Sequence, residues 1–155
     1  MILAEIILIC GKICSGKTTF AEKLKSEQNA VILSCDEIML GIFDEQLGER
    51  HEYVLTKVKK YLIKLSEQII ASETNVILDW GFWTASERNS VRRYYSERGI
   101  NTKLYYVKVD DKLWEQRIEK RNSLNDKRSY FVDDNLISLM NDKFEEPDDA
   151  LIVEI

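Results

Sequence analysis

Five short runs rich in valine, isoleucine and leucine recur along the chain. Runs of this length and composition are typical of strands that are covered on both faces of a sheet. The run that precedes the glycine-containing stretch GKICSGKTTF is the most apolar of them. We predict strands at residues 6–10, 30–34, 75–79, 103–109 and 150–155.

Helical patterns lie between these runs. Residues 18–28 and 52–72 repeat apolar side chains at the spacing of an α-helix. The sequence TASE at residues 84–87 forms a capping-box pattern, in which Thr84 caps a helix and Glu87 reaches back to it, and Gly99 would end that helix. We predict helices at residues 18–28, 52–72, 84–98, 110–121 and 133–144.

Strands that alternate with helices indicate an α/β fold with a parallel sheet and helices on both faces. A chain of 155 residues suits one compact domain, which we place at residues 1–155. In such sheets, ligands bind beyond the carboxyl ends of the strands. The polar residues that follow the first three strands are therefore predicted to converge at one edge of the sheet.

The composition, 45% hydrophobic and 32% charged, is that of an ordinary folded protein. The net charge of −5 argues against non-specific binding of nucleic acid, although it leaves a local basic groove open. The three cysteines show no metal-binding spacing, and we expect Cys10 and Cys35 to be small buried side chains in a cytoplasmic protein. No apolar run approaches the ~20 residues of a membrane span, so we expect no membrane partner.

The sequence GKICSGKT, residues 11–18, matches the pattern G-x-x-x-x-G-K-[ST] between a predicted strand and a predicted helix. Glycines let consecutive backbone N–H groups turn around an anion, and the following helix adds its N-terminal partial positive charge. Lys17 is then placed to reach the β- and γ-phosphates, and the Thr18 hydroxyl to bind Mg²⁺. We call residues 11–18 the phosphate loop. The predicted nucleotide contacts are Gly11, Lys12, Cys14, Ser15, Gly16, Lys17, Thr18 and Thr19.

Two carboxylates follow the second and third predicted strands. Asp36 is predicted to accept the proton of a substrate hydroxyl that attacks the γ-phosphate, or to cap a short helix beginning at Glu37. Asp79 is predicted to hold Mg²⁺ or substrate, or to cap a turn before Gly81. His51, the single histidine, has no partners for a catalytic triad and is expected on the surface or in a substrate loop.

Aromatic and basic side chains extend this candidate site. Trp80, Phe82 and Trp83 either wall a substrate pocket or fill the core. Arg88, about one turn into the next helix, is placed to clamp a substrate or phosphate. Arginines that close over the γ-phosphate lower the barrier to phosphoryl transfer, whereas the default for any one arginine is a solvated surface position. The candidates for this catalytic role are Arg117, Arg121 and Arg128.

With the phosphate loop, Asp36, LDWGFW (78–83), Arg88 and RIEKRN (117–122), the chain resembles a group of small P-loop kinases. That branch includes chloramphenicol phosphotransferase, the zeta-toxin kinases and the kinase domain of polynucleotide kinase. The resemblance spans nearly the full length. It implies a three-layer P-loop NTPase fold whose five-stranded parallel sheet has the order 2-3-1-4-5, with a short lid at about 121–132.

The resemblance also implies ATP and Mg²⁺ as cofactors, with Lys17 on the phosphates, Thr18 on the metal and Asp36 as base. Residues 144–150 resemble the segment that lies against the nucleotide base in such kinases. The chain departs from the family where a substrate-binding arginine commonly follows the base closely, because no arginine follows Asp36 before Arg50. Either Arg88 takes that role or the acceptor is not an anionic group of that kind.

We therefore expect an ATP-dependent phosphotransferase that acts on the hydroxyl of a small molecule. Two alternatives stay open: a 5′-hydroxyl kinase for nucleic acid, and a nucleotide-binding regulator with little turnover. The guanine-reading motif N-K-x-D is absent, and a AAA-type motor would need a longer chain. Neither the acceptor nor the oligomeric state follows from the sequence.

Overall fold

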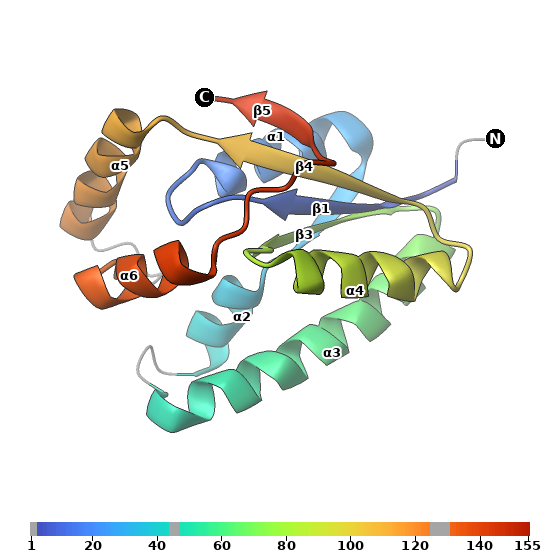
Figure 1. The fold of residues 1–155 in the computed structure, drawn as a ribbon. Coiled ribbons are helices and arrows are strands. Elements are labelled where there is room, and N and C mark those ends of the chain that lie inside the picture. Colours follow the sequence, from blue (N-terminus) through green and yellow to red (C-terminus); the bar gives the residue numbers. More distant parts are fainter. Residues whose placement is uncertain (1–2, 44–46, 125–130) are drawn as a thin grey trace.

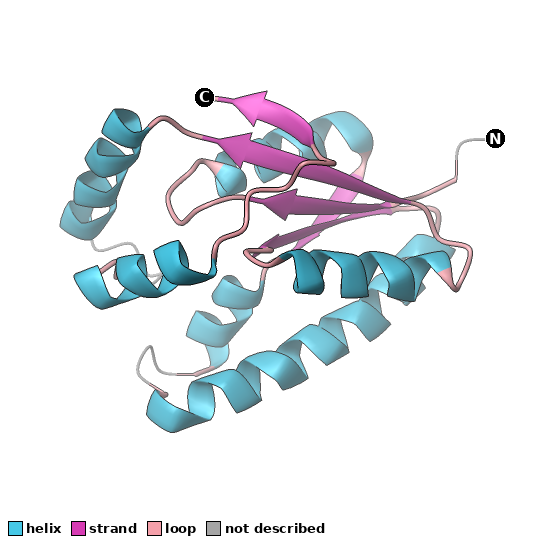
Figure 2. Cartoon of the chain, in the orientation of Figure 1, coloured by secondary structure: helices cyan, strands magenta, loops and turns pink. Residues whose placement is uncertain are grey.

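A computed structural model describes residues 3–43, 47–124 and 131–155 of the chain. Its five strands are all parallel and lie in the order β2-β3-β1-β4-β5. Helices cover both faces of this sheet (Figure 2). The α/β class and the strand order that the family resemblance implied are therefore confirmed.

The elements follow the predicted alternation. The strands are β1 (Ile6–Cys10), β2 (Ala30–Leu33), β3 (Asn75–Gly81), β4 (Thr102–Lys108) and β5 (Leu151–Glu154). The helices are α1 (Lys17–Gln28), α2 (Cys35–Ile42), α3 (His51–Ala71), α4 (Ala85–Ser96), α5 (Asp111–Leu124) and α6 (Asp134–Lys143), with a short 3₁₀ helix, η1 (Gly48–Arg50).

Strand β1 lies in the middle of the sheet, and all five of its residues are 0% exposed. Ile6, Leu8 and Cys10 pack in a cluster with side chains of α3 and α4, whereas Ile7 and Ile9 pack in a second cluster with α1. Figure 1 shows α3 and α4 side by side on one face of the sheet. Burial on both faces explains why β1 is apolar at every position.

The start of α2 corrects one interpretation of the sequence. Ser34, not Asp36, caps this helix: its hydroxyl accepts a hydrogen bond from the N–H of Glu37 at 3.3 Å. The alternative that Asp36 caps a helix beginning at Glu37 is therefore wrong. The strand β2 ends at Leu33, one residue earlier than predicted, and Ser34 is the cap of α2. Asp36 lies in the first turn of α2, where the helix dipole favours a carboxylate.

The start of α4 agrees with half of the predicted capping box. Thr84 caps the helix, since its hydroxyl accepts a hydrogen bond from the N–H of Glu87 at 3.2 Å. The Glu87 carboxylate, however, forms an ion pair with Lys59 of α3 at 2.5 Å. This pair links the two helices that cover one face of the sheet.

The predicted ends of β3 and of the lid also need comment. β3 continues past Asp79 to Gly81, where Gly81 pairs with Cys10 after a shift in register. Asp79 is thus the fifth residue of a strand rather than its last, so the turn cap proposed as its alternative role is wrong. Most of the predicted lid, residues 125–130, lies outside the described residues.

The cap of α2 gives a stability prediction. Replacing Ser34 by Ala should lower the free energy of unfolding by about 1 kcal/mol, because the Glu37 N–H loses its acceptor. Ser26→Ala is the matched control: that hydroxyl is exposed and binds only a carbonyl within α1, so the change should stay within about 0.5 kcal/mol. Urea denaturation measures both, and equal stabilities would contradict the capping role.

Candidate active site

The phosphate loop begins where β1 ends, and its first glycine is required by close packing. The N–H of Gly11 donates to the carbonyl of Gly81 at 3.0 Å, which ties the loop to β3. A Cβ atom on Gly11 would lie 2.7 Å from Ser15 Oγ and 2.8 Å from the carbonyl oxygen of Val107. No larger residue fits there without moving the backbone of β4.

The second glycine of the loop sets the start of α1. Gly16 has φ 101°, a left-handed conformation that favours glycine, and it is the N-cap residue of α1 without a side-chain hydrogen bond. In contrast, Ser34, Thr84 and Asp133 cap α2, α4 and α6 with side-chain oxygens. The N-cap residue of α1 therefore provides no side-chain acceptor for the first N–H groups of the helix, an arrangement that suits an added anion.

Three side-chain donors hold carbonyl groups of the loop, one from within the loop and two from outside it. Lys17 Nζ donates to the carbonyl of Lys12 at 2.6 Å, and Trp114 Nε1 donates to that of Ile13 at 2.6 Å. Arg117 Nη1 donates to the carbonyl of Ser15 at 2.9 Å. Two of these donors belong to α5, so this helix fixes the shape of the phosphate loop.

The remaining predicted nucleotide contacts lie on or beside this loop. Ser15 is 1% exposed, and its Oγ is a buried side-chain atom without a hydrogen-bond partner among the described residues. Cys14 is buried with φ 60°, whereas Thr19 is exposed at the start of α1. The Lys12 ammonium lies 4.9 Å from the centre of the Trp114 ring. An unpaired buried hydroxyl in such a loop suits an added acceptor or donor.

The Thr18 hydroxyl donates to Asp79 Oδ2 at 3.1 Å. This contact joins the end of the phosphate loop to the next strand, and it sets two oxygen ligands side by side. Mg²⁺ prefers such hard oxygen ligands and commonly takes only one or two from the protein when phosphates supply others. The pair therefore fits a phosphate-bound magnesium ion.

Lys17 is influenced by the charges of both carboxylates of the site, Asp79 and Asp36. Burial lowers the pKa of Lys17 below its ordinary value, while the charges of Asp79 and Asp36 oppose that shift. Arg121 acts in the same direction as burial, because a second positive charge disfavours the ammonium form. A bound phosphate would favour the charged form of Lys17.

Asp36 remains accessible to solvent, yet the protein surrounds it enough for desolvation to raise its pKa. Lys17 opposes this shift, Asp79 adds to it, and Arg121 and His51 oppose it more weakly. These four groups come from α1, β3, α5 and α3. A carboxylate whose pKa is raised is a stronger base once it is ionised.

The three candidate arginines differ in position. Arg117 is held on the outside of the phosphate loop by its bond to Ser15. Arg121, one turn further along α5, acts electrostatically on Lys17, Asp36 and Cys14. Arg128 lies outside the described residues. Of the two described arginines, Arg121 is the one whose charge acts on Asp36.

The aromatic residues after β3 separate into two kinds. Phe82 is 0% exposed and stacks on Trp80 with ring centres 5.6 Å apart, so Phe82 belongs to the core. Trp80 is half-buried and its Nε1 donates to the carbonyl of Leu33 at 2.9 Å. Trp83 is half-buried beside Gly81, and its carbonyl accepts from the N–H of Glu145.

Arg88 is 3% exposed, so the alternative of a solvated surface arginine is wrong for this residue. Its Nη1 donates to the carbonyl of Phe82 at 2.7 Å and lies 3.8 Å from Cys10 Sγ. The guanidinium thus carries a positive charge behind the start of the phosphate loop. A direct contact between Arg88 and a substrate stays a prediction.

Two contacts of the site were missed by the sequence reasoning. Trp114 lies three residues before Arg117, and this helical spacing was a usable signal because it puts both on one face of α5. Met140 Sδ accepts a hydrogen bond from the N–H of Ile13 at 3.2 Å. Met140 lies far from Ile13 in the sequence, and no local pattern links α6 to the loop.

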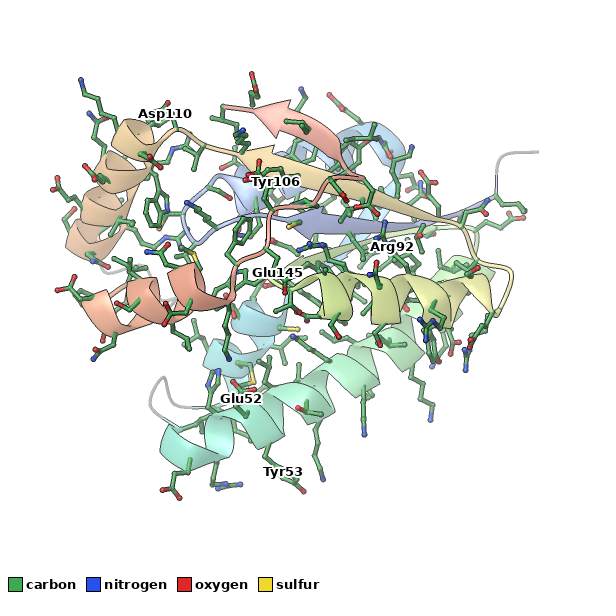
Figure 3. The ribbon with its side chains drawn as sticks, in the orientation of Figure 1. Glu52, Tyr53, Arg92, Tyr106, Asp110 and Glu145 are labelled. Carbon is green, nitrogen blue, oxygen red and sulfur yellow. The ribbon has the colours of Figure 1, made fainter. Side chains whose placement is uncertain are left out.

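A cavity of about 350 Å³ opens beside the phosphate loop. We call it the Phe144 pocket. Phe144 stands near Tyr106, with ring centres 6.0 Å apart, and Lys108 pairs with Glu146 at 3.4 Å. Figure 3 labels Tyr106 on β4 above the segment that follows α6. The lining residues are Lys12, Tyr106, Val107, Lys108, Val109, Asp111, Phe144 and Glu146.

A family model described as an AAA domain, AAA_33, matches residues 6–147. The chain belongs to the AAA_33 family. The match includes the phosphate loop, both carboxylates and all the strands except β5.

Solved structures resemble this AAA_33 domain along most of its length. Chaetomium thermophilum Kti12 in complex with ADP-AlF3 has a TM-score of 0.73 at 14% identity, covering 96% of this chain and 88% of that one. A sugar kinase from Janibacter sp. HTCC2649 has a TM-score of 0.62 at 14% identity, covering 98% and 84%. At such identities the likeness shows the fold alone, a P-loop NTPase fold shared with kinases.

A chain of the Pnkp1/Rnl/Hen1 RNA repair complex has a TM-score of 0.72 at 19% identity. The likeness covers 94% of the AAA_33 domain and 47% of that chain. A search among curated proteins found no match. In the part of the chain that the structure describes, no helix has the length and apolar character needed to cross a membrane.

The geometry of the loop gives a testable prediction. Gly16→Ala should lower the free energy of unfolding by about 1–3 kcal/mol and weaken ADP binding, because φ is 101° and the new Cβ would lie 2.7 Å from Arg117 Nη1. Gly41→Ala is the control: its Cβ meets no atom within 4 Å in α2, so it should be neutral or up to about 1 kcal/mol stabilising. Thermal unfolding and calorimetry with ADP check both variants, and an unchanged Gly16→Ala protein would refute the requirement for glycine.

Proposed function

We propose that this chain is an ATP-dependent phosphotransferase that moves the γ-phosphate of ATP to a hydroxyl of a small-molecule acceptor. The observation that carries the proposal is the grouping of Asp36 with Lys17, Asp79 and Arg121 at the mouth of the phosphate loop. A protein that only binds a nucleotide has no need of a solvent-accessible base at this place. The kinase fold of the structural relatives is consistent with it.

Nucleotide binding rests on the phosphate loop and on the Phe144 pocket beside it. The N–H groups at the start of α1 and the Lys17 ammonium bind the phosphates, and Arg117 keeps the loop in shape. The Phe144 pocket, which includes Lys12 of the same loop, receives the nucleobase of the nucleotide. Aromatic and aliphatic walls with a few charged groups are typical of such a pocket.

Magnesium fits the oxygen pair of Thr18 and Asp79. When bound, the ion would neutralise charge on the phosphates during transfer. Among the described residues there is no group of three or more His, Cys, Asp or Glu side chains that could hold a metal by themselves. The proposed ion therefore depends on the nucleotide for most of its ligands.

Asp36 accepts the proton of the acceptor hydroxyl. The hydroxyl oxygen forms a bond to the γ-phosphorus, the bond from that phosphorus to the β–γ bridging oxygen breaks, and ADP leaves. Arg121 stabilises the charge that spreads over the transferred group. Its influence on both Lys17 and Asp36 supports this assignment among the candidate arginines.

The acceptor side of the site favours an uncharged alcohol. The side chain that acts on Asp36 from α3 is His51, and Arg88 of α4 is buried, with its guanidinium bound to the carbonyl of Phe82. The buried cysteines Cys10, Cys14 and Cys35 are free thiols, which is consistent with a reducing compartment such as the cytoplasm.

The direct test of the proposed phosphotransfer is a screen of sugars, nucleosides and other alcohols for transfer of label from γ-labelled ATP. Labelled product is expected with at least one alcohol and should vanish in excess chelator.

The roles of Lys17 and Asp36 are separable by mutation. Lys17→Met should abolish ATP binding, whereas Asp36→Asn should bind ATP normally while transfer falls by about 10²–10⁴-fold, the loss of a general base. Glu37→Gln, at the exposed neighbouring position, is the control and should keep full activity. Calorimetry and single-turnover transfer measure these effects. Equal turnover in Asp36→Asn and the parent would remove Asp36 from the mechanism.

The raised pKa of Asp36 predicts the pH dependence of transfer. The base must be ionised, so the rate should rise with pH through this pKa, above the range of an ordinary aspartate. Arg121→Gln removes a charge that lowers this pKa. The acidic limb of the pH–rate profile, in which the transfer rate rises with pH, should therefore move to higher pH, in addition to any loss of rate. Arg93→Gln, on the exposed side of α4, should leave the limb in place. A limb that stays put in Arg121→Gln would contradict the electrostatic coupling.

A further inference from the structure

The outer face of α3 carries a row of basic and aromatic side chains. Each member has another member three or four residues away, so all of them lie on one side of the helix. All are exposed, on the side of α3 that faces away from the sheet, where Figure 3 labels Tyr53. We call this row the α3 strip: Arg50, Tyr53, Lys57, Lys60, Tyr61 and Lys64.

The two rings of the strip are unusually open. Tyr53 is 60% exposed and Tyr61 is 64% exposed, although aromatic rings normally bury most of their surface. The Lys57 ammonium lies 4.9 Å from the centre of the Tyr53 ring. The cation lies over one face of the Tyr53 ring, so a partner would stack on the other face, close to a positive charge.

The strip is also free of negative charge along most of its length. No acidic residue occurs in α3 between Tyr53 and Ser66. Glu67 is engaged by Arg98 at 3.1 Å and by the hydroxyl of Tyr94, and Glu87 is engaged by Lys59. Acidic Glu49 and Glu52 flank the strip at its N-terminal end only. A local positive surface thus exists on a chain whose net charge is −5.

We propose that the α3 strip binds single-stranded nucleic acid. Its cations complement a phosphate backbone, and its two open rings complement unpaired bases, which stack on aromatic side chains without regard to sequence. From the rise of an α-helix, the three lysines stand about 4.5 and 6 Å apart along the axis, Arg50 stands about 10 Å before Lys57, and the two rings stand about 12 Å apart. These spacings match an extended strand that lies along the helix.

Other anionic partners fit this surface less well. A membrane-binding helix inserts an apolar face, but the apolar face of α3, with Val54 and Leu62, is buried against the sheet. An acidic protein surface would use the lysines but leave the two rings without a partner. The combination of cations and rings therefore favours nucleic acid.

The strip begins beside the candidate active site, because His51, the first residue of α3, acts on Asp36. The strip itself lies on the opposite side of α3 from the sheet, where Figure 3 labels Tyr53. The proposal concerns a binding surface and does not require phosphotransfer. It also explains how binding can occur despite the overall negative charge, since the interaction is local and falls with salt.

Fluorescence anisotropy with a labelled 20-nucleotide oligouridine tests the proposal. We expect saturable binding at low salt with a dissociation constant of about 1–100 μM, typical of non-specific binding. Neutralising three or four phosphates on a single strand predicts a slope of about −2 to −3 for log K against log salt. The absence of saturable binding at about 20–50 mM salt, where electrostatic binding is strong, would overturn the proposal.

Paired variants locate the surface. Lys60→Glu combined with Lys64→Glu should weaken binding by at least tenfold and flatten the salt slope. Lys23→Glu combined with Lys25→Glu, at two exposed positions on α1, is the control: it changes the net charge by the same amount and should have little effect on binding. Equal loss in both pairs would place binding elsewhere. Thermal unfolding confirms that both proteins are folded.

The rings provide the second arm of the test. Tyr61→Ala should weaken binding about five- to hundredfold, and Tyr61→Trp should restore it, as expected for stacking on a base. Double-stranded RNA of the same length should bind less tightly than the single strand. An unchanged affinity in Tyr61→Ala, or binding to vesicles of anionic phospholipid in place of oligouridine, would contradict the proposal.

Discussion

The anchoring of the phosphate loop to its surroundings is the constraint on which the candidate site depends. The loop leaves a strand with no exposed surface, is tied to β3 through Gly11 and Gly81, and is held from outside by Trp114 and Arg117. Because these donors engage carbonyl groups of the loop, the start of α1 stays open toward the site. Preorganised backbone dipoles of this kind need little rearrangement when an anion binds.

The charges around the loop form a set that an added phosphate would complete. Burial lowers the pKa of Lys17 and raises the pKa of Asp36, so both groups are disfavoured in their charged forms in the absence of further ligands. A phosphate beside Lys17 would restore the ammonium, and the base would stay reactive at the sheet edge. Perturbed groups of opposite kind, close together and accessible, are what a transfer site requires. Arg88 adds a buried charge behind the loop.

Much of this architecture was predictable because the signals are local. The run before Gly11, the glycine pattern and the polar ends of three strands specify a parallel sheet with a phosphate loop at one edge, and the resemblance to small kinases supplied the strand order. The contacts of Met140 and Arg88 were not predictable, since they depend on how α6 and α4 pack against the sheet. The contact of Trp114 had a local signal in its helical spacing from Arg117, which the sequence reasoning did not use. Capping of α2 was considered as an alternative role of Asp36 and not of Ser34, because both residue types cap helices and the sequence does not show which of the two begins the helix.

A crystal structure with a non-hydrolysable ATP analogue and Mg²⁺ is the most direct test of phosphate binding by Lys17 and the amides at the start of α1. We expect the β-phosphate inside the phosphate loop, the Lys17 ammonium moved from the Lys12 carbonyl to the phosphates, and the γ-phosphate directed toward Asp36. An empty loop at saturating nucleotide, or a nucleotide bound elsewhere with Lys17 still on Lys12, would contradict it.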